Sequence, residues 1–256
     1  MRTLSLVTGT LLAALVLSTA DVRAATHIPK YISQAVTNPA RPEADRNADV
    51  DRKPEETVAF SGVKPGEKVV DLWPGGGYFT RIFSAVVGPK GHVYAVPPSK
   101  RPNAPADAPD PGARVQAIAA DPHYSNVSVV ATPLTEMKLP EPVDLVWTSR
   151  NYHDFHNIPN LDVSAIDKAI FNALKPGGVF VVLDHAAEKG SGFRDTSTLH
   201  RVDPEAVKQE VVAAGFKFEG QSEVLRNAND PHTEKVFEAS VKGKTDQFIL
   251  KFRKPK

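Results

Sequence analysis

From about residue 63 onward, apolar positions along the chain follow two alternating patterns. Short continuous apolar runs predict buried strands at residues 68–72, 92–96, 127–131, 143–148 and 179–184. Apolar residues spaced by three or four positions predict helices at residues 78–87, 161–174 and 204–214. Strands that alternate with helices in this way indicate an α/β domain, with a mostly parallel sheet and helices on both faces.

Two more strands are predicted near the C-terminus, at residues 216–219 and 248–252. The polar segment 226–245 separates them and is expected to form a loop. Because no helix intervenes, the two strands are expected to pair antiparallel. We therefore predict a mostly parallel seven-stranded sheet with one antiparallel edge strand.

The segment before this alternation has a different pattern. Residues 25–62 contain helix signals without strong strands, because Ile28, Ile32 and Val36 are spaced for one helical face. Pro54 stands near the expected first turn of a later helix. We predict an N-terminal helical cap at residues 25–62, followed by one domain at residues 63–256.

The first residues have the features of a secretory signal. Arg2 precedes an uncharged stretch at residues 3–20, and its segment 11–17 is wholly apolar. Small residues up to Ala24 have the usual cleavage spacing, which predicts a signal peptide at residues 1–24. The apolar run is short for a membrane span, although an uncleaved anchor is the alternative. We expect a periplasmic or secreted protein without a stable membrane anchor after cleavage.

The composition narrows the range of partners. The chain has no cysteine, which excludes disulfides, thiolate catalysis and zinc sites with cysteine ligands. The formal net charge is only +1, so the chain has no large positive charge that would attract nucleic acid or anionic lipid. We expect a small-molecule substrate and no nucleic-acid partner, and the oligomeric state stays open.

The first predicted strand leads into a glycine-rich turn. Asp71 ends the apolar run, and three glycines stand immediately before the next helix. Glycine lets the backbone approach a ligand closely, and the helix N-terminus offers free N–H groups. A dinucleotide fingerprint would need glycine at the positions of Trp73 and Tyr78, so the pattern disfavours a nicotinamide cofactor.

Residues 69–80 resemble motif I of the class I S-adenosylmethionine (SAM) methyltransferases. Residues 143–147 and 171–180 resemble the fourth strand and the helix, turn and fifth strand of the same superfamily. The Trp-Pro-Gly-Gly-Gly loop, the Asn-Tyr-His-Asp segment and the terminal Phe-Ile-Leu-Lys-Phe-Arg-Lys run resemble a group of exported predicted methyltransferases. The resemblance implies a Rossmann-like class I fold, SAM as cofactor, and methyl transfer to a small or exported acceptor.

The resemblance also implies which residues contact SAM. They are Asp71, Trp73, Gly75, Gly76, Gly77, Tyr78, Thr132 and Asn151. Trp73 stands where the superfamily usually has glycine, so its indole could narrow the pocket, stack on a ligand or pack against the N-terminal helices. The second strand is followed by Pro97 rather than by the acid that usually binds the ribose hydroxyls.

A second polar segment follows the fourth predicted strand, where the superfamily often has catalytic residues. His153 is the predicted general base, because imidazole exchanges protons near neutral pH. Asp154 is expected to orient an imidazole, and Tyr152 to orient the substrate. These are the predicted catalytic residues.

Two other functions stay open beside methyl transfer. The first is an exported ligand-binding protein that kept the fold but not the activity. The second is a metal-dependent enzyme that uses His153 and His185, since imidazoles with a nearby acid can bind zinc or iron. Their spacing matches no specific metal motif, so no metal is assigned and both histidines are only weak candidates.

Overall fold

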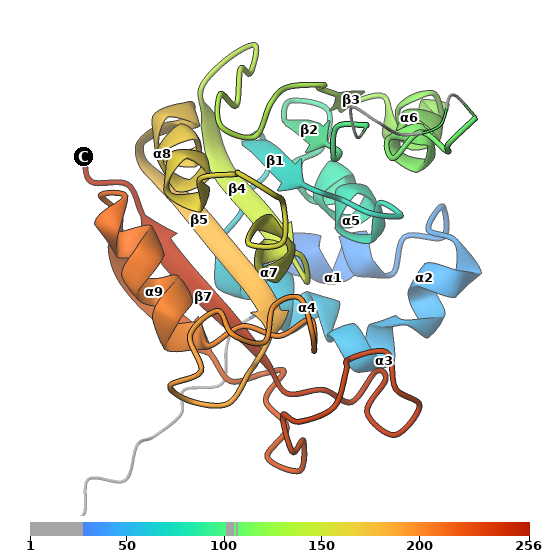
Figure 1. Ribbon diagram of the computed structural model, residues 1–256. Coiled ribbons are helices and arrows are strands. Elements are labelled where there is room, and N and C mark those ends of the chain that lie inside the picture. Colours follow the sequence, from blue (N-terminus) through green and yellow to red (C-terminus); the bar gives the residue numbers. More distant parts are fainter. Residues whose placement is uncertain (1–27, 101–104, 106) are drawn as a thin grey trace, which may run out of the picture.

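The computed structural model describes residues 28–100, 105 and 107–256. The predicted signal peptide at residues 1–24 lies outside the described residues. Seven strands form one sheet in the order β3-β2-β1-β4-β5-β7-β6 (Figure 1). Their bounds are β1 Lys68–Leu72, β2 His92–Val96, β3 Val127–Val129, β4 Val143–Ser149, β5 Leu174–His185, β6 Lys217–Ser222 and β7 Gln247–Arg253. Strands β1 to β5 pair in parallel, as the alternation with helices predicts.

The predicted place of the antiparallel strand is wrong. Strand β7 is antiparallel, but it lies between β5 and β6, so the edge of the sheet is β6. The burial of the two strands gives the physical reason. Phe248, Ile249 and Leu250 are buried in succession, as expected for a strand covered on both faces, whereas side chains of β6 are exposed or half-buried.

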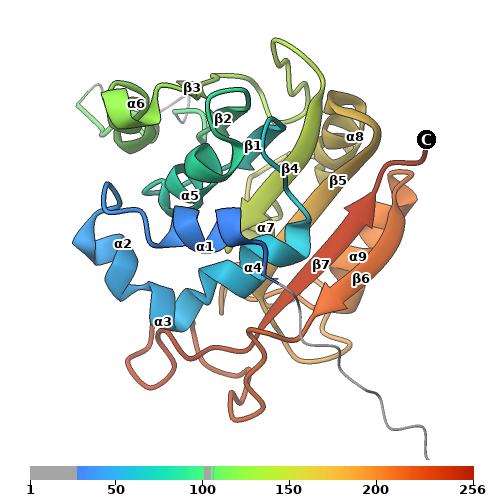
Figure 2. The ribbon, with the colours of Figure 1, turned by 180° about the vertical axis from the view of Figure 1, so that it is seen from behind.

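Helices cover both faces of the sheet, as predicted (Figures 1 and 2). On one face lie α1 Lys30–Val36, α4 Pro54–Ser61, α5 Tyr78–Val87 and α6 Ala113–Ala119, and the short helices α2 Glu43–Asn47 and α3 Asp49–Arg52 connect α1 to α4. On the other face lie α7 Tyr152–Phe155, α8 Val163–Ala173 and α9 Pro204–Ala213. Each set of helices encloses its own hydrophobic core.

Helix α5 joins the glycine-rich turn to the core. Phe79 and Phe83 on its buried face pack against Trp147 of β4, with ring centroids 4.8 and 5.5 Å apart. Ile32 of α1 is fully buried in the same core. The helix signals at residues 25–62 thus correspond, over the described residues, to helices that pack on the face of the sheet that α5 covers.

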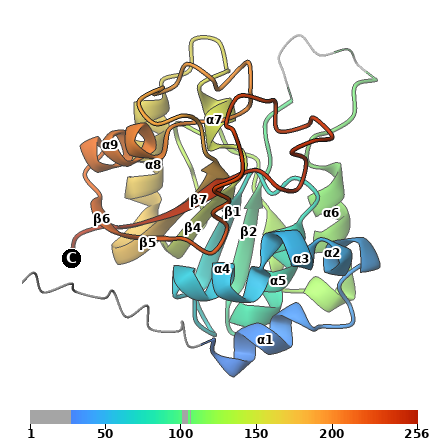
Figure 3. The ribbon, with the colours of Figure 1, turned by 90° about the horizontal axis from the view of Figure 1, so that it is seen from below.

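The carboxyl end of β5 is covered by two long connections. The connection 186–203 and the loop 223–246 lie together there, and the loop reaches α3 (Figures 1 and 3). The Nζ of Lys53 donates a hydrogen bond to the carbonyl of Val224 at 2.8 Å, which ties the loop to the N-terminal helices. Within the described residues, none of the helices combines the length and apolarity needed to cross a membrane.

Candidate functional site

The glycine-rich turn has a left-handed backbone at alternate residues. The φ angles of Trp73, Gly75 and Gly77 are 52°, 57° and 79°. A Cβ atom at Gly77 would lie 2.1 Å from Cδ1 of Ile118, so α6 closes that side of the turn. A Cβ at Gly75 would meet no atom within 4 Å, so the turn is open there. Gly76 is also exposed, and the two residues form the open side.

Asp71 lies behind the turn rather than on its open side. Its carboxylate is buried and accepts a hydrogen bond of 2.6 Å from the hydroxyl of Thr80 in α5. Burial raises the pKa of Asp71 to about 7, although the hydrogen bonds from Thr80 and the charge of Arg52 act in the opposite direction. The acid therefore holds the turn against α5 and ionises only near neutral pH.

Trp73 occupies a backbone conformation that suits glycine, which is a source of strain for any larger residue. Its N–H donates to the carbonyl of Val96 at 2.8 Å, so the turn is tied to the end of β2. Its ring meets Phe155 of α7 edge-on at 5.0 Å. The alternative in which the indole packs against the N-terminal helices is wrong, because those helices cover the opposite face of the sheet.

Tyr78 points toward the N-terminal helices. Its hydroxyl donates to Oδ1 of Asp49 at 2.6 Å, and the guanidinium groups of Arg41 and Arg52 lie 5.2 and 4.4 Å from its ring centre. Burial and the hydrogen bond to Asp49 raise the pKa of Tyr78. The side chain thus joins the turn to the N-terminal helices.

Asn151 and Thr132 make local contacts that fix loops. The side-chain amide of Asn151 donates to the carbonyl oxygens of Trp73 at 2.9 Å and of Ser149 at 3.1 Å. Its oxygen accepts a hydrogen bond from the Thr148 hydroxyl. The Thr132 hydroxyl accepts from a backbone N–H six residues later, at 3.0 Å. Asn151 therefore holds the glycine-rich turn against the end of β4.

His153, Asp154 and His200 lie together beyond the ends of β4 and β5, and we call them the histidine cluster. The Nδ1 of His153 is 2.9 Å from the fully buried carboxylate of Asp184, and its Nε2 is 3.3 Å from Nδ1 of His200. Burial by itself would lower the pKa of His153, but Asp184 and Asp154 outweigh it and raise the pKa. Two of the three predicted catalytic residues therefore meet here, together with His200.

Tyr152, the third of them, lies inside the layer of helices α7, α8 and α9. It is fully buried, and its hydroxyl lies 2.9 Å from Oδ2 of Asp167 and 2.7 Å from Oε2 of Glu210. Burial and the two carboxylates raise the pKa of Tyr152 well above its usual value. The side chain packs behind the histidine cluster rather than in it.

His185 does not join the histidine cluster. Its Nδ1 lies 2.7 Å from the Thr245 hydroxyl, and its ring centre is 6.4 Å from that of His153. Burial lowers the pKa of His185 to about 3, so the ring is neutral at physiological pH. The structure thus separates the two histidines that the sequence suggested as metal candidates.

Two arginines near the glycine-rich turn are not among the site residues predicted from the sequence. Burial lowers the pKa of Arg150 to about 10, and the nearby charge of Arg52 adds to this effect. Arg150 has a φ of 60°, and its Nε donates to Gln247 at 2.9 Å. Arg52 and Arg150 bring two positive charges to this region, which favours an anionic ligand group. The sequence offers no local signal for the pair, because Arg52 and Arg150 come from elements far apart in the chain.

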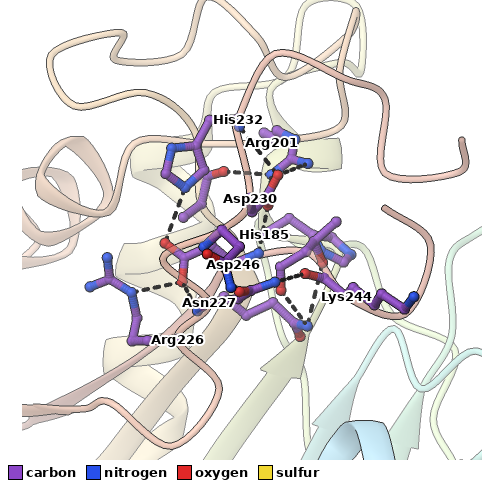
Figure 4. Close-up of polar contacts among 12 residues, drawn as sticks. His185, Arg201, Arg226, Asn227, Asp230, His232, Lys244 and Asp246 are labelled. Carbon is purple, nitrogen blue, oxygen red and sulfur yellow. Dashed lines mark hydrogen bonds and ion pairs between the residues drawn. The ribbon is translucent and has the colours of Figure 1, made fainter. Parts of the chain in front are cut away.

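A buried ion pair fixes the connection that carries His200 (Figure 4). The guanidinium of Arg201 donates to both carboxylate oxygens of Asp230, at 2.7 and 3.0 Å. Asp246 adds a second anchor, since its carboxylate accepts from Nε of Arg226 at 2.8 Å and lies 3.1 Å from Nε2 of His232. The connection 186–203 and the loop 223–246 are therefore locked to each other beside the histidine cluster.

Comparison with known proteins gives distant relatives of one kind. No protein-family model matches the chain. The ubiquinone/menaquinone biosynthesis C-methyltransferase UbiE of Vibrio cholerae is 30% identical over 152 residues, which cover 56% of this chain and 52% of UbiE. The UbiE of Vibrio vulnificus is 29% identical over 128 residues, covering 50% of this chain and 45% of that protein. The chain thus spans about half the length of the curated relatives it matches.

Solved structures share the fold. A SAM-dependent methyltransferase from Aquifex aeolicus superposes with a TM-score of 0.58 at 19% identity, covering 82% of this chain and 95% of the other. The glycopeptide N-methyltransferase MtfA, solved with SAM, superposes with a TM-score of 0.53 at 14% identity, covering 82% and 87%. The sheet order and these structural matches confirm the predicted Rossmann-like class I methyltransferase fold.

Proposed function

We propose that this chain is a SAM-dependent methyltransferase that acts on a small-molecule acceptor. The open backbone at Gly75 carries the proposal, because it lies at the carboxyl edge of a parallel sheet, where ligands bind in folds of this kind. The glycine-rich turn and the histidine cluster both follow strand ends at this edge. The names of the sequence relatives and the SAM complex of MtfA support the same chemistry.

The residues around the turn offer positive charge and open backbone to SAM. The guanidinium groups of Arg52 and Arg150 complement a carboxylate, and a ligand can approach the backbone at Gly75 without meeting a side chain. The end of β2 at Pro97 offers no side-chain acceptor for ribose hydroxyls, so the turn and the arginines are proposed to provide most of the contacts. When bound, SAM supplies an electrophilic methyl group.

Methyl transfer depends mainly on the placement of donor and acceptor. The histidine cluster follows the neighbouring strand and is half-open to solvent, so it is proposed to orient the acceptor. Nδ1 of His153 is held by Asp184, which leaves Nε2 to take a proton from an acceptor that must lose one. The predicted signal peptide supports a periplasmic or secreted location, and hence an exported acceptor.

The open side of the turn can be tested by replacing Gly75 with alanine. We expect Gly75→Ala to weaken SAM binding at least tenfold, about 1.4 kcal/mol, because the new methyl group occupies the surface that the ligand approaches. Isothermal titration with SAM and with S-adenosylhomocysteine measures the change.

Gly66→Ala is the matched control. Gly66 also has a positive φ, 86°, and open space around its Cα, but it lies in the turn before β1, at the opposite edge of the sheet. Both variants should lose about 1–2 kcal/mol of stability from backbone strain, whereas only Gly75→Ala should lose affinity. Equal SAM affinities in the two variants would contradict the proposed site.

A wild-type chain that binds no SAM at millimolar concentration would reject the methyltransferase proposal. Trp73 at the superfamily's glycine position and Pro97 after β2 favour one second candidate, a protein that binds another ligand at the same edge. Native mass spectrometry of the freshly purified chain distinguishes the two, because a retained ligand other than SAM supports the second candidate.

A further inference from the structure

The histidine cluster brings three potential metal-ligating atoms to nearly equal separations. Nε2 of His153 lies 3.3 Å from Nδ1 of His200 and 3.4 Å from Oδ1 of Asp154. The third side of the triangle, from Nδ1 of His200 to Oδ1 of Asp154, is 3.5 Å. Ligand atoms about 2.1 Å from a tetrahedral zinc ion lie about 3.4 Å apart, whereas octahedral neighbours would lie about 3.0 Å apart. The observed triangle matches one face of a tetrahedron.

Asp184 prepares His153 to act as a ligand. Its fully buried carboxylate lies 2.9 Å from Nδ1 of His153 and also accepts the backbone N–H of His153 at 2.9 Å. A proton on Nδ1 that is donated to this carboxylate leaves the lone pair of Nε2 directed away from Asp184. A carboxylate behind a ligating histidine is the usual arrangement at protein metal sites, where it fixes the ring and increases its basicity.

The charges of these groups also match a divalent cation. Asp154 and Asp184 supply two carboxylates, and the two imidazoles are neutral when they ligate a metal. The nearest buried cation of the adjoining connection, Arg201, is already paired with Asp230. Arg150 also carries a positive charge that acts on Asp184, and a divalent ion would add positive charge beside Asp154.

The exposure of the three side chains leaves one coordination position open. The side chain of His153 is 4% exposed, whereas those of His200 and Asp154 are 31% and 36% exposed. Structural zinc sites use four protein ligands, and sites with three protein ligands keep the fourth position for water or substrate. The histidine cluster has the second arrangement.

We propose that His153, Asp154 and His200 form a four-coordinate site for a divalent transition metal of the zinc type, with an oxygen or nitrogen of solvent or ligand in the fourth position. The site differs from the sequence-based pair of His153 and His185, because His185 is bonded to Thr245 instead. It does not depend on SAM binding. With the metal bound, His153 is a ligand rather than a base, and an acceptor oxygen in the fourth position would lose its proton more readily.

Cobalt(II) titration of the full chain tests the proposal without SAM. The chain is purified without a histidine tag, stripped with a chelator and titrated with Co²⁺ under visible absorption, and Zn²⁺ is then added in competition. We expect one equivalent to bind with the intense bands of four-coordinate Co²⁺, and Zn²⁺ to displace it. Less than about a tenth of an equivalent, or only the weak bands of six-coordinate Co²⁺, would overturn the proposal.

Variants locate the bound metal. His200→Ala should reduce the affinity for Zn²⁺ at least 100-fold, and Asp154→Asn, at a half-exposed position, provides a milder change if His200→Ala fails to fold. Asp184→Asn should weaken binding 10- to 100-fold, since it removes only the carboxylate behind His153. His123→Ala is the matched control, because His123 and Asp121 form a similar pair, 2.8 Å apart, on the exposed surface.

Two outcomes of these variants decide the assignment. Unchanged binding in His123→Ala together with losses in the other variants supports the site. Unchanged stoichiometry and affinity in folded Asp154→Asn and His200→Ala would place the metal elsewhere and overturn the proposal. SAM binding is tested separately by the SAM titration, so either proposal can fail while the other stands.

Discussion

Arg201→Met is expected to lower the free energy of unfolding by about 3–5 kcal/mol. Arg201 and Asp230 have side chains that are 0% exposed, so removing the guanidinium leaves a buried carboxylate without its cation. The substitution also removes donors to the carbonyls of Glu234 at 2.9 Å and of Ala186 at 3.0 Å. Unfolding in urea, followed by circular dichroism, measures the loss.

Arg194→Met is the control for the charge itself. Arg194 pairs with Glu188 and Asp195, but its side chain is 62% exposed, and exposed ion pairs contribute about 0–1 kcal/mol. The double variant Arg201→Met, Asp230→Asn should recover part of the loss, since it removes the unpaired charge and keeps an acceptor oxygen. Similar losses in Arg194→Met and Arg201→Met would contradict this interpretation of the buried pair.

The consequence for function follows from the place of Arg201 in the chain. His200 is the preceding residue and has a left-handed φ of 56°, so the ion pair holds the backbone that presents the imidazole. At a temperature where Arg201→Met is still folded, the substitution should therefore also weaken the binding of any ligand to the histidine cluster. A folded variant with unchanged Co²⁺ affinity would show that the loop keeps its shape without the pair.

Asp71→Asn is expected to change the pH dependence of stability more than any other single carboxylate change considered. Burial raises the pKa of Asp71 from 3.8 to about 7, a difference of about three units. Each unit corresponds to about 1.4 kcal/mol, so ionising the folded-state carboxyl costs about 4 kcal/mol. The cost arises because the side chain lies buried between β1 and α5, where the Thr80 hydroxyl donates a hydrogen bond to it but no cation pairs with it among the described residues.

The direction of this effect follows from proton linkage. Between pH 4 and pH 7 the folded chain keeps the proton of Asp71, whereas the unfolded chain has already lost it. The stabilisation from this group is therefore complete below about pH 4 and is lost as the pH rises through 7. Asparagine has no proton to lose, so Asp71→Asn should gain stability relative to the wild type over that range.

The measurement compares urea unfolding of both proteins at half-unit steps from pH 4 to pH 8. Asp107→Asn, at an exposed loop position, controls for the removal of one carboxylate. The difference between wild type and Asp71→Asn should change by several kcal/mol across the range, while the difference for Asp107→Asn stays nearly constant. Parallel curves for all three proteins would show that Asp71 keeps its ordinary pKa when folded.

Most of the fold could be predicted from spacing along the chain. Strands and helices of the domain follow from apolar periodicity, and the glycine-rich turn follows from its position between a strand and a helix. The prediction of the sheet edge was wrong, because the edge position depends on which of the last two strands has both faces buried. The apolar run Phe248-Ile249-Leu250 indicates a strand with both faces buried, and the more polar sequence of β6 indicates an edge strand.

Less of the site could be predicted, because the sequence indicates single site residues but not which residues they contact in the fold. His153 and Asp154 were predicted together, and the structure adds His200, which lies 47 positions from His153. Tyr152 and Tyr78 were predicted to face a ligand, but they point into the helical layers on opposite faces of the sheet. Their apolar rings favour burial, and their hydroxyls find carboxylates there.

The sequence by itself determined the order of elements, the parallel sheet and the position of the glycine-rich turn at its carboxyl edge. These properties depend on local spacing and on the handedness of the crossovers, which a single chain encodes over short distances. Only the tertiary structure decided that His200 rather than His185 meets His153 and that Arg201 is paired with Asp230. Such contacts join loops far apart in sequence, and their geometry depends on how the whole set of connections packs.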